Sequence, residues 1–326
     1  MVMKYDKLIE KKRALSSLRP LPAELVRNLD DWFKIELTYT SNAIEGNTLT
    51  RRETAVVIEK GITIGGKSLK EHLEATNHAQ ALDQIKIIAG KKLPSLMLKD
   101  ILTIHGIILK GIDDENAGRF RNVPVRISGS SVIMPNPRKV PELMAEFQKW
   151  LNSKNSLHPV AFAGEAHYRL VSIHPFVDGN GRTARLLMNL ILLMHGYPPA
   201  IIKKSERLSY ISALEKAQLG GSREGYDKII YKAANRSLDI YINSAKGKTV
   251  QEDVDTEELL KIGKLAKAAG ETVPTIRHWT KEGLLEVAEI TKSGYQLYAS
   301  DMIERCKQIK KLQTQRLTLE EIRRKF

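Results

Sequence analysis

Twelve consecutive residues, HPFVDGNGRTAR at positions 174–185, bring together side chains of the types that nucleotide chemistry uses. His174 can accept a proton near neutral pH, because an unperturbed imidazole titrates near ~6.5. Asp178 offers a hard oxygen ligand of the kind that Mg²⁺ prefers when the ion also holds substrate phosphates. The segment therefore contains a candidate base and a candidate metal ligand only four residues apart.

The middle of this segment is suited to binding an anion. Gly179 and Gly181 carry no Cβ, so the backbone can approach a phosphate closely. The turn runs directly into the apolar run LLMNLILLMHGY, and the N-terminus of the helix predicted there attracts negative charge. Arg182 and Arg185 are three residues apart, so they share a helix face and can reach the same anion. A GNG turn alone is common in loops, but a purely structural turn has no use for a base, an acid and two guanidinium groups.

The segment resembles the signature of the Fic (filamentation induced by cyclic AMP) family, HxFx(D/E)GNGRxxR. Every specified position is filled, by His174, Phe176, Asp178, Gly179, Asn180, Gly181, Arg182 and Arg185. The similarity extends over residues 35–240 and includes TSNAIEGNTLT and GRFRNVPVRI. It implies an all-α fold, with a helical Fic core and a short β-hairpin flap. It also implies transfer of AMP from ATP to a Ser, Thr or Tyr hydroxyl of a target protein, with release of pyrophosphate.

The resemblance assigns roles to the residues of the signature. His174 would be the general base that takes the proton of the target hydroxyl, and Asp178 would hold Mg²⁺ against the phosphates of ATP. The main-chain N–H groups from Gly179 to Arg182 and the Asn180 side chain would form the anion cradle, with Gly181 inside it. Arg182 and Arg185 would clamp the β- and γ-phosphates, which leave as pyrophosphate.

A hairpin is predicted between Arg119 and Pro137, where VPVRISGSSVIMPNP alternates β-branched residues with glycine, serine and proline turns. An ordinary surface hairpin has the same pattern. By its position in the family it would be the flap, whose edge strand pairs with a target segment. Val132 and Ile133 would then face the nucleotide. Tyr210 and Gln218 fall where the family contacts adenine and ribose, although Gln218 replaces an asparagine of the animal enzymes.

The sequence SNAIEG at residues 41–46 fits the inhibitory pattern (S/T)xxxE(G/N) of the same family. Its glutamate, Glu45, would pair with Arg185, so that this guanidinium is not free to hold the γ-phosphate. Because this motif lies in the same chain, the inhibition would act in cis. A simple helix end, with Gly46 near the C-cap, is the structural alternative. The same carboxylate could also position water for removal of AMP, so the direction of the reaction stays open.

Helical periodicity dominates the first 245 residues and defines the elements that must position this site. Helices are predicted at residues 30–39, 70–88, 98–109, 140–151 and 160–173. Polar residues without apolar periodicity follow near position 244 and indicate a linker. We expect four regions: an N-terminal helical region with the inhibitory motif (1–95), the Fic core (96–243), a linker (244–257) and a small domain (258–326).

The C-terminal region reads as helix, glycine turn, helix and wing, with Gly270 at the turn and Thr272 as a candidate cap of the second helix. It resembles the winged helix-turn-helix domain of MerR-type regulators. That resemblance places Arg277, His278 and Lys281 against DNA, and a wing around residues 292–295 on the phosphate backbone. A protein-docking module that selects the target of AMP transfer is the alternative.

Composition sets the remaining bounds. The 326 residues allow two or three domains, and the single cysteine, Cys306, excludes an internal disulfide and fits a reducing cytosol. The N-terminus has no apolar core of signal-peptide length, and the longest apolar run is far shorter than the ~20 residues of a membrane span. We therefore expect a cytoplasmic protein without membrane contact; a homo-oligomer stays open. The net charge of +14 is densest in residues 258–326, which hold 14 Lys and Arg against 9 Asp and Glu.

Three hypotheses for the whole protein follow. The first is an autoinhibited adenylyltransferase with ATP and Mg²⁺ at its site and a targeting module at its C-terminus. The second is a DNA-binding regulator whose Fic-like core only senses nucleotide. The third is a phosphotransferase of the Doc type, which the GNGR turn disfavours. The complete set of His174, Asp178, Asn180, Arg182 and Arg185 favours the enzyme, because a sensor has no need of a base.

Overall fold

The computed structural model describes residues 5–91, 96–154, 156–248, 259–287, 289–291, 294–298, 302–315 and 317–323. The chain forms two compact units. The first consists of Met1–Arg126, Val132–Ile202 and Ala213–Val250. The second consists of Ile127–Ser131, Lys203–Ser212 and Gln251–Phe326. Both regions expected within residues 1–243 thus contribute to the first unit, and much of the expected linker lies outside the described residues.

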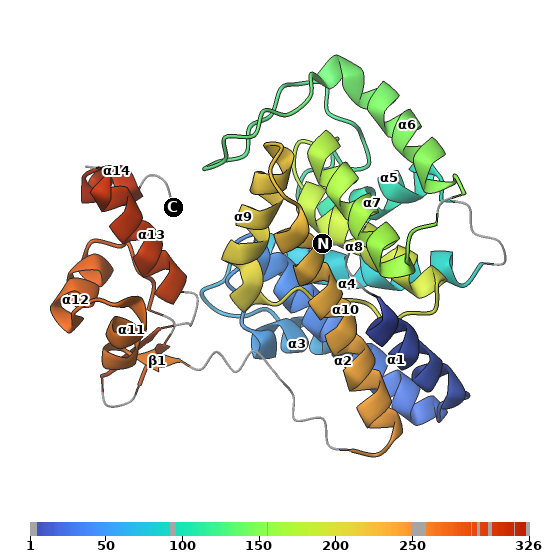
Figure 1. The fold of residues 1–326 in the computed structure, drawn as a ribbon, viewed down its shortest axis with the longest axis horizontal. Coiled ribbons are helices and arrows are strands. Elements are labelled where there is room, and N and C mark those ends of the chain that lie inside the picture. Colours follow the sequence, from blue (N-terminus) through green and yellow to red (C-terminus); the bar gives the residue numbers. More distant parts are fainter. Residues whose placement is uncertain are drawn as a thin grey trace. The chain divides into compact units, whose positions relative to one another are not determined.

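The first unit is helical (Figure 1). Its helices are α1 (Asp6–Ser17), α2 (Ala23–Ile44), α3 (Arg51–Lys60), α4 (Leu69–Ala89), α5 (Leu98–Leu109), α6 (Val140–Leu151), α7 (Pro159–Ile173), α8 (Asn180–Met194) and α10 (Glu224–Ala245). Short 3₁₀ turns η1 (Pro137–Lys139) and η2 (Lys204–Glu206) precede α6 and α9 (Arg207–Gln218), and α9 has residues in both units. The all-α prediction is confirmed.

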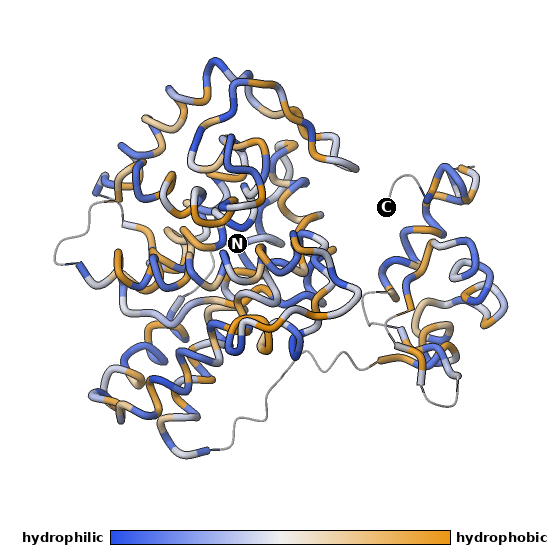
Figure 2. The backbone as a smooth tube through the Cα atoms, turned by 180° about the vertical axis from the view of Figure 1, so that it is seen from behind, coloured by the Kyte–Doolittle hydropathy of each residue, from blue (hydrophilic) through white to orange (hydrophobic). Residues whose placement is uncertain are grey.

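Helix α8 is the centre of this unit, because α2, α4, α5 and α7 all pack against it. Its apolar residues are almost completely buried: Leu186, Leu187, Met188, Leu190, Ile191 and Leu192. Figure 2 shows that hydrophobic and hydrophilic residues alternate along the helices of this unit. Burial of apolar side chains stabilises the fold by about 1.5–3 kcal/mol each. The signature segment therefore leads directly into a deeply buried helix of the unit.

The two helices that follow the inhibitory motif along the chain, α3 and α4, begin at well-formed caps. Thr50 caps α3, and Ser68 caps α4, each within a capping box completed by Glu53 or Glu71. The predicted helices at 70–88, 98–109, 140–151 and 160–173 are confirmed by α4 to α7 within one residue at each end. The helix predicted at 30–39 is the middle of the longer α2.

No helix in the described part of the chain is both long and apolar enough to cross a bilayer.

The hairpin predicted between Arg119 and Pro137 is wrong in one respect. The chain does turn there, with Ser130 N donating to the carbonyl of Ile127 at 3.1 Å and Gly129 at φ +76°. Neither arm is a β-strand in the structure. Alternating β-branched residues favour extended backbone, but a two-stranded hairpin without a third strand or a covering core is only marginally stable. We call residues 122–136 the flap segment.

The second unit contains a helix-turn-helix. Strand β1 (Leu260–Lys261) leads into α11 (Ile262–Ala269), which ends at Gly270 with φ +67°, and Thr272 caps α12 (Val273–Lys281) as predicted. Strands β2 (Glu289–Ile290) and β3 (Gln296–Tyr298) complete an antiparallel sheet in the order β1-β3-β2. Helices α13 (Met302–Thr314) and α14 (Leu319–Arg323) follow. Part of the predicted wing, including residue 292, lies outside the described residues.

Candidate functional site

The signature forms the connection between α7 and α8. Helix α7 ends at His174, which is left-handed, with φ 51° and ψ 59°, and whose N–H donates to the carbonyl of Leu170 at 2.9 Å. For a residue with a side chain this conformation costs roughly 1–2 kcal/mol, so the surrounding contacts must hold it. At the other end Gly179, with φ +76°, is the N-cap of α8. Because Gly179 has no side chain to cap the helix, it leaves the amides of the first turn of α8 available to a ligand.

His174 is suited to accept a proton. Burial lowers the pKa of His174 below its ordinary value, and the positive charge of Arg121 lowers it further. The carbonyl of Val171 and the carboxylates of Glu45 and Asp178 act in the opposite direction. A lowered pKa keeps the imidazole neutral at physiological pH, which is the state that a general base requires.

The loop between the two helices is held by side chains that face inward. The amide group of Asn180 accepts from the N–H of Phe176 at 3.0 Å and donates to its carbonyl at 2.9 Å. The ring of Phe176 stacks on His105 of α5, with centroids 3.6 Å apart. The structure thus uses the Asn180 side chain to fix the loop, whereas the sequence suggested that it lines the anion cradle.

His105 is a neutral donor that supports the same loop. Its Nδ1 accepts from the N–H of Gly118 at 2.9 Å, so Nε2 carries the proton and donates to the carbonyl of Asp178 at 3.0 Å. Burial lowers the pKa of His105 to about 4, which keeps this tautomer neutral. Sequence reasoning did not identify His105, although a single histidine within the apolar segment ILTIHGIIL was the available signal.

The two arginines of the signature have different partners. Arg182 is only 2% exposed; its guanidinium donates to Glu74 of α4 at 3.1 Å and lies 3.4 Å from the carboxylate of Asp178. Sequence reasoning missed Glu74 as well. Its signal was an acidic residue on a face of the predicted helix that also carries Ala75, His78 and Leu82. Glu74 neutralises an arginine that would otherwise be buried without a counter-charge.

Arg185 is held by the inhibitory motif. Its Nε donates to the hydroxyl of Ser41 at 3.0 Å, and one terminal nitrogen donates to the Ser41 carbonyl at 2.9 Å and to the Glu45 carboxylate at 2.6 Å. The carboxylate also lies against the first turn of α8, since a Cβ built on Gly181 would stand 2.3 Å from Glu45 Oε1. The motif is a helix end, as the structural alternative predicted, because α2 ends at Ile44 with Glu45 as its C-cap. The predicted contact of Glu45 with Arg185 is made from this helix end, whereas its inhibitory effect stays a prediction.

The loop between α7 and α8, residues 174–179, is called the catalytic loop here because of the role predicted for His174. A cavity of about 410 Å³ adjoins it. It is lined by the flap segment and α6, by Tyr168, Arg169 and Ser172 of α7, and by the end of α9. Three residues predicted to surround the nucleotide line it together, namely Val132, Ile133 and Gln218, and the Gln218 amide donates to the hydroxyl of Ser172 at 3.3 Å. Tyr210 lies on α9 within the residues of the second unit, so its contact with adenine stays a prediction.

Asp178 supplies the carboxylate of the signature. Its side chain is 51% exposed, and its Oδ1 accepts from the N–H of Gly179 at 2.5 Å. No group of three or more His, Cys, Asp or Glu side chains that could hold a metal occurs among the residues the structure describes. A single exposed carboxylate fits Mg²⁺, which usually binds one or two carboxylates together with phosphates and water.

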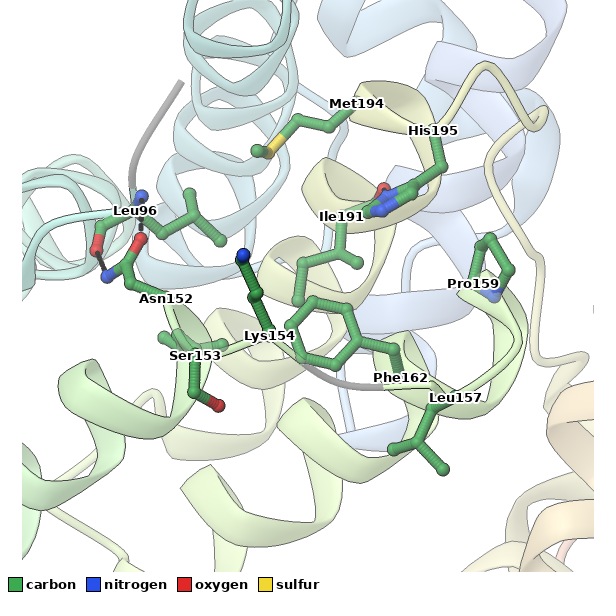
Figure 3. A pocket seen from close by; sticks show the side chains of 11 residues that line it. Leu96, Asn152, Ser153, Lys154, Leu157, Pro159, Phe162, Ile191, Met194 and His195 are labelled. Carbon is green, nitrogen blue, oxygen red and sulfur yellow. Dashed lines mark hydrogen bonds between the residues drawn. The ribbon is translucent and has the colours of Figure 1, made fainter. Parts of the chain in front are cut away.

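A second cavity, of about 450 Å³, is lined by none of the predicted site residues. Figure 3 shows Lys154 extending between Leu96, Ile191 and Phe162, with Met194 and His195 at its rim. Leu96 precedes α5, Lys154 follows α6, Phe162 lies on α7, Ile191 and Met194 lie on α8, and His195 is the C-cap of α8.

In the second unit, the three residues predicted to contact DNA lie on one exposed face of α12. Arg277, His278 and Lys281 are exposed, whereas Ile276 and Trp279 of the same helix are buried in the core of the unit. His278 is 3.9 Å from Glu282 one turn later. A recognition helix requires this division between a buried and a basic exposed face.

Comparison with family models identifies two matching segments. Residues 95–192 match the model of the Fic/DOC family. Residues 260–326 match the model of the MerR HTH family regulatory proteins. The first match includes the whole signature and the loop that precedes it, and the second includes the helix-turn-helix.

Curated relatives match most of the chain. The chain is 39% identical over 241 residues to the protein adenylyltransferase Fic of Culex quinquefasciatus, which is 73% of this chain and 47% of that protein. It is 41% identical over 237 residues to the protein of the same name from Drosophila grimshawi, which is 72% of this chain and 48% of that protein. The chain thus spans about half the length of these relatives.

Solved structures of Fic proteins are similar to this chain as well. A Fic-domain-containing signalling protein from Bacteroides thetaiotaomicron superposes with a TM-score of 0.72 at 30% identity, covering 76% of this chain and 99% of that chain. Residues 134–508 of Fic-1 from Caenorhabditis elegans give a TM-score of 0.67 at 32% identity, covering 74% of this chain and 72% of that chain. A Fic family protein from Desulfovibrio desulfuricans covers 92% of this chain with a TM-score of 0.61, but at 21% identity this likeness concerns the fold alone.

Proposed function

Because this chain belongs to the Fic/DOC family, we propose that its helical unit is a protein adenylyltransferase that is inhibited by its own Glu45. The donor is ATP, and the acceptor is a Ser, Thr or Tyr hydroxyl of a target protein. The observation that carries this proposal is the convergence on the first turn of α8 of a neutral buried histidine, an exposed carboxylate and an arginine already held by Glu45.

The chemical step needs one proton acceptor and one leaving group. His174 takes the proton of the target hydroxyl, and the oxygen of that hydroxyl forms a bond to the α-phosphorus of ATP. The bond from that phosphorus to the bridging oxygen of the β-phosphate breaks, and pyrophosphate leaves. A positioned general base contributes typically about 10²–10⁴-fold to such a rate. The left-handed backbone of His174 fixes where its ring is presented.

The phosphates are positioned by the start of α8. Its uncapped amides and the helix dipole bind negative charge, and Gly181 leaves room for the approach. Arg185 holds the γ-phosphate once Glu45 has moved, while Arg182, fixed by Glu74, supports the carboxylate of Asp178. A Mg²⁺ ion held by Asp178 would neutralise charge on the phosphates. The cavity beside the flap segment has the volume and the Gln218 amide to receive the adenosine end.

The contacts of Glu45 support the proposed inhibition. It pairs with Arg185 at 2.6 Å and occupies the space in front of Gly181. A carboxylate there both removes the partner of the γ-phosphate and repels it. Displacement of the end of α2 would activate transfer, and the same carboxylate is also placed to orient water for removal of AMP.

The decisive experiment incubates the Glu45→Gly protein with ATP labelled on the α-phosphate, and in parallel with ATP labelled on the γ-phosphate. We expect protein labelling from the α-label only, at least tenfold above the wild type, and none from Glu45→Gly with His174→Ala. Labelling from the γ-phosphate would identify a phosphotransferase instead. Equal labelling of the wild type and Glu45→Gly would contradict autoinhibition.

A second function is favoured by the geometry of α12. Its exposed basic face and the preceding turn at Gly270 support DNA binding by the second unit, in the manner of the family that residues 260–326 match. In this proposal the second unit brings the adenylyltransferase to DNA. It differs from the hypothesis of a DNA-binding regulator, in which the Fic-like core only senses nucleotide and does not catalyse transfer.

A further inference from the structure

A single buried arginine, Arg121, joins both ends of the flap segment to the catalytic loop. Its side chain is 3% exposed. Nε donates to the carbonyl of His174 at 2.7 Å, and the two terminal nitrogens donate to the carbonyls of Val123 at 3.1 Å and Pro135 at 2.6 Å. The main-chain N–H of Arg121 also donates to the carbonyl of Pro175 at 2.9 Å.

These contacts depend on the shape of the guanidinium group. It presents five N–H donors in a rigid plane, so one group can reach carbonyl oxygens on three different segments. The ammonium of a lysine concentrates its donors at one point and can keep only part of this set. All three acceptors of the Arg121 side chain are main-chain carbonyls, which fixes backbone positions and not side-chain rotamers.

The His174 carbonyl is the most consequential of the three acceptors. His174 has a left-handed backbone and precedes a proline, and residues before proline prefer extended conformations. Without the bond from Arg121, the peptide between His174 and Pro175 loses a contact that opposes this preference. Rotation of that peptide would move the imidazole that acts as the base.

We infer that Arg121 is a positioning residue that fixes the catalytic loop and the base of the flap segment as one assembly. A target held on the flap segment then meets the imidazole of His174 at a set distance. This inference rests on the proposed adenylyltransferase function. It assigns a role in turnover to a residue that lies outside the family signature.

The test uses the full chain in the Glu45→Gly background and measures its self-labelling from α-labelled ATP. We expect Arg121→Lys to lower the maximal labelling rate on the order of 10–100-fold, because a displacement of about 1 Å can cost that much, and to leave the KM for ATP within about twofold. The matched control is Arg119→Lys, an exposed arginine two residues earlier, which should label like its parent. If the parent itself does not label, the proposed function fails, and this inference fails with it.

The pH profile separates positioning from charge. Arg121→Gln removes a positive charge that lowers the pKa of His174, so the acidic limb of the labelling rate should move to higher pH, while Arg121→Lys should leave that limb in place. Should Arg121→Gln fail to fold, Arg121→Lys carries the test, since its stem fills the same space. A labelling parent combined with an unchanged maximal rate in Arg121→Lys would overturn the inference. So would a rate that falls only in proportion to the folded fraction measured by circular dichroism.

Discussion

Glu45 and Gly181 are 136 positions apart in the chain, yet the carboxylate of one fills the space that a methyl group on the other would need. A Cβ at position 181 would stand 2.3 Å from Glu45 Oε1 and 3.1 Å from a terminal nitrogen of Arg185. The proposed inhibition therefore depends on the absence of a side chain at this point of α8. In the proposed mechanism the space beside this glycine holds the phosphate in the active state and the Glu45 carboxylate in the inhibited state.

This proximity predicts energetic coupling between the two positions. Gly181→Ala should expel the Glu45 carboxylate from Arg185 and lower the free energy of unfolding by about 1–2 kcal/mol, whereas in the Glu45→Gly background it should cost clearly less. Urea unfolding of the four proteins measures the coupling. Gly65→Ala is the control, because a Cβ there has nothing within 4 Å and should show no coupling to Glu45→Gly. Additive effects of Gly181→Ala and Glu45→Gly would contradict this prediction.

The role of a residue could be predicted where its partners are close to it in the sequence. It could not be predicted where the partners are many residues away along the chain. Glu45 could be matched to Arg185 only through the family pattern, and the structure bears out the contact. Glu74 lies 108 residues from Arg182, and Arg121 lies 53 residues from His174. No periodicity or motif connects such pairs, because their proximity is created by the packing of α4, α5 and α7 around α8.

Among the elements, α2 and α4 together determine where the inhibitory carboxylate lies. Asn42 near the end of α2 donates to the carbonyl of Glu74 on α4 at 3.1 Å, and the Thr38 hydroxyl bonds to Nδ1 of His78 at 3.1 Å. Helical periodicity predicted α4 almost to the residue but found less than half of α2. The longer extent of α2 depends on burial against α4 and α10, which the local pattern does not contain.

His78 makes this junction sensitive to acid. Burial lowers the pKa of His78 to about 3, with Arg185 and Arg182 lowering it further, whereas an unfolded histidine titrates near ~6.5. The unfolded state therefore binds a proton that the folded state does not, so stability is present above about pH 6.5 and is lost as the pH falls towards the folded value.

We expect the free energy of unfolding of the wild type to fall between pH 6.5 and pH 5 by about 1–2 kcal/mol more than that of His78→Asn, because only the wild type carries this proton linkage. Urea unfolding at the two pH values, followed by circular dichroism, measures the difference. His167, with a pKa also lowered by burial to about 3, remains in both proteins and cancels in the comparison. Parallel pH dependence in the two proteins would show that His78 does not titrate on unfolding.

At the scale of the whole molecule, the chain combines a proposed nucleotide site in one unit with a basic helix in the other. The compact units divide between Val250 and Gln251, and a linker at residues 244–257 was predicted from a loss of apolar periodicity. The assignment of residues 127–131 and 203–212 to the second unit was not, since nothing in their composition distinguishes them from the helical unit. The function of the second unit can be tested separately from catalysis, because its exposed basic residues are distinct from the signature.

If α12 binds DNA, its affinity must respond to salt in proportion to the phosphates it neutralises. We expect the full chain to bind a 40-base-pair duplex of random sequence with an affinity that falls steeply as salt is raised. Lys281→Ala should weaken binding and reduce the slope of log affinity against log salt by about 1, which is the loss of one phosphate contact. Fluorescence anisotropy measures both quantities.

The control is Lys149→Ala, which replaces an exposed lysine on α6 of the first unit and should leave the slope unchanged. A slope that is small in the wild type and equal in Lys281→Ala would exclude phosphate binding by α12 and favour a protein-docking role for the second unit.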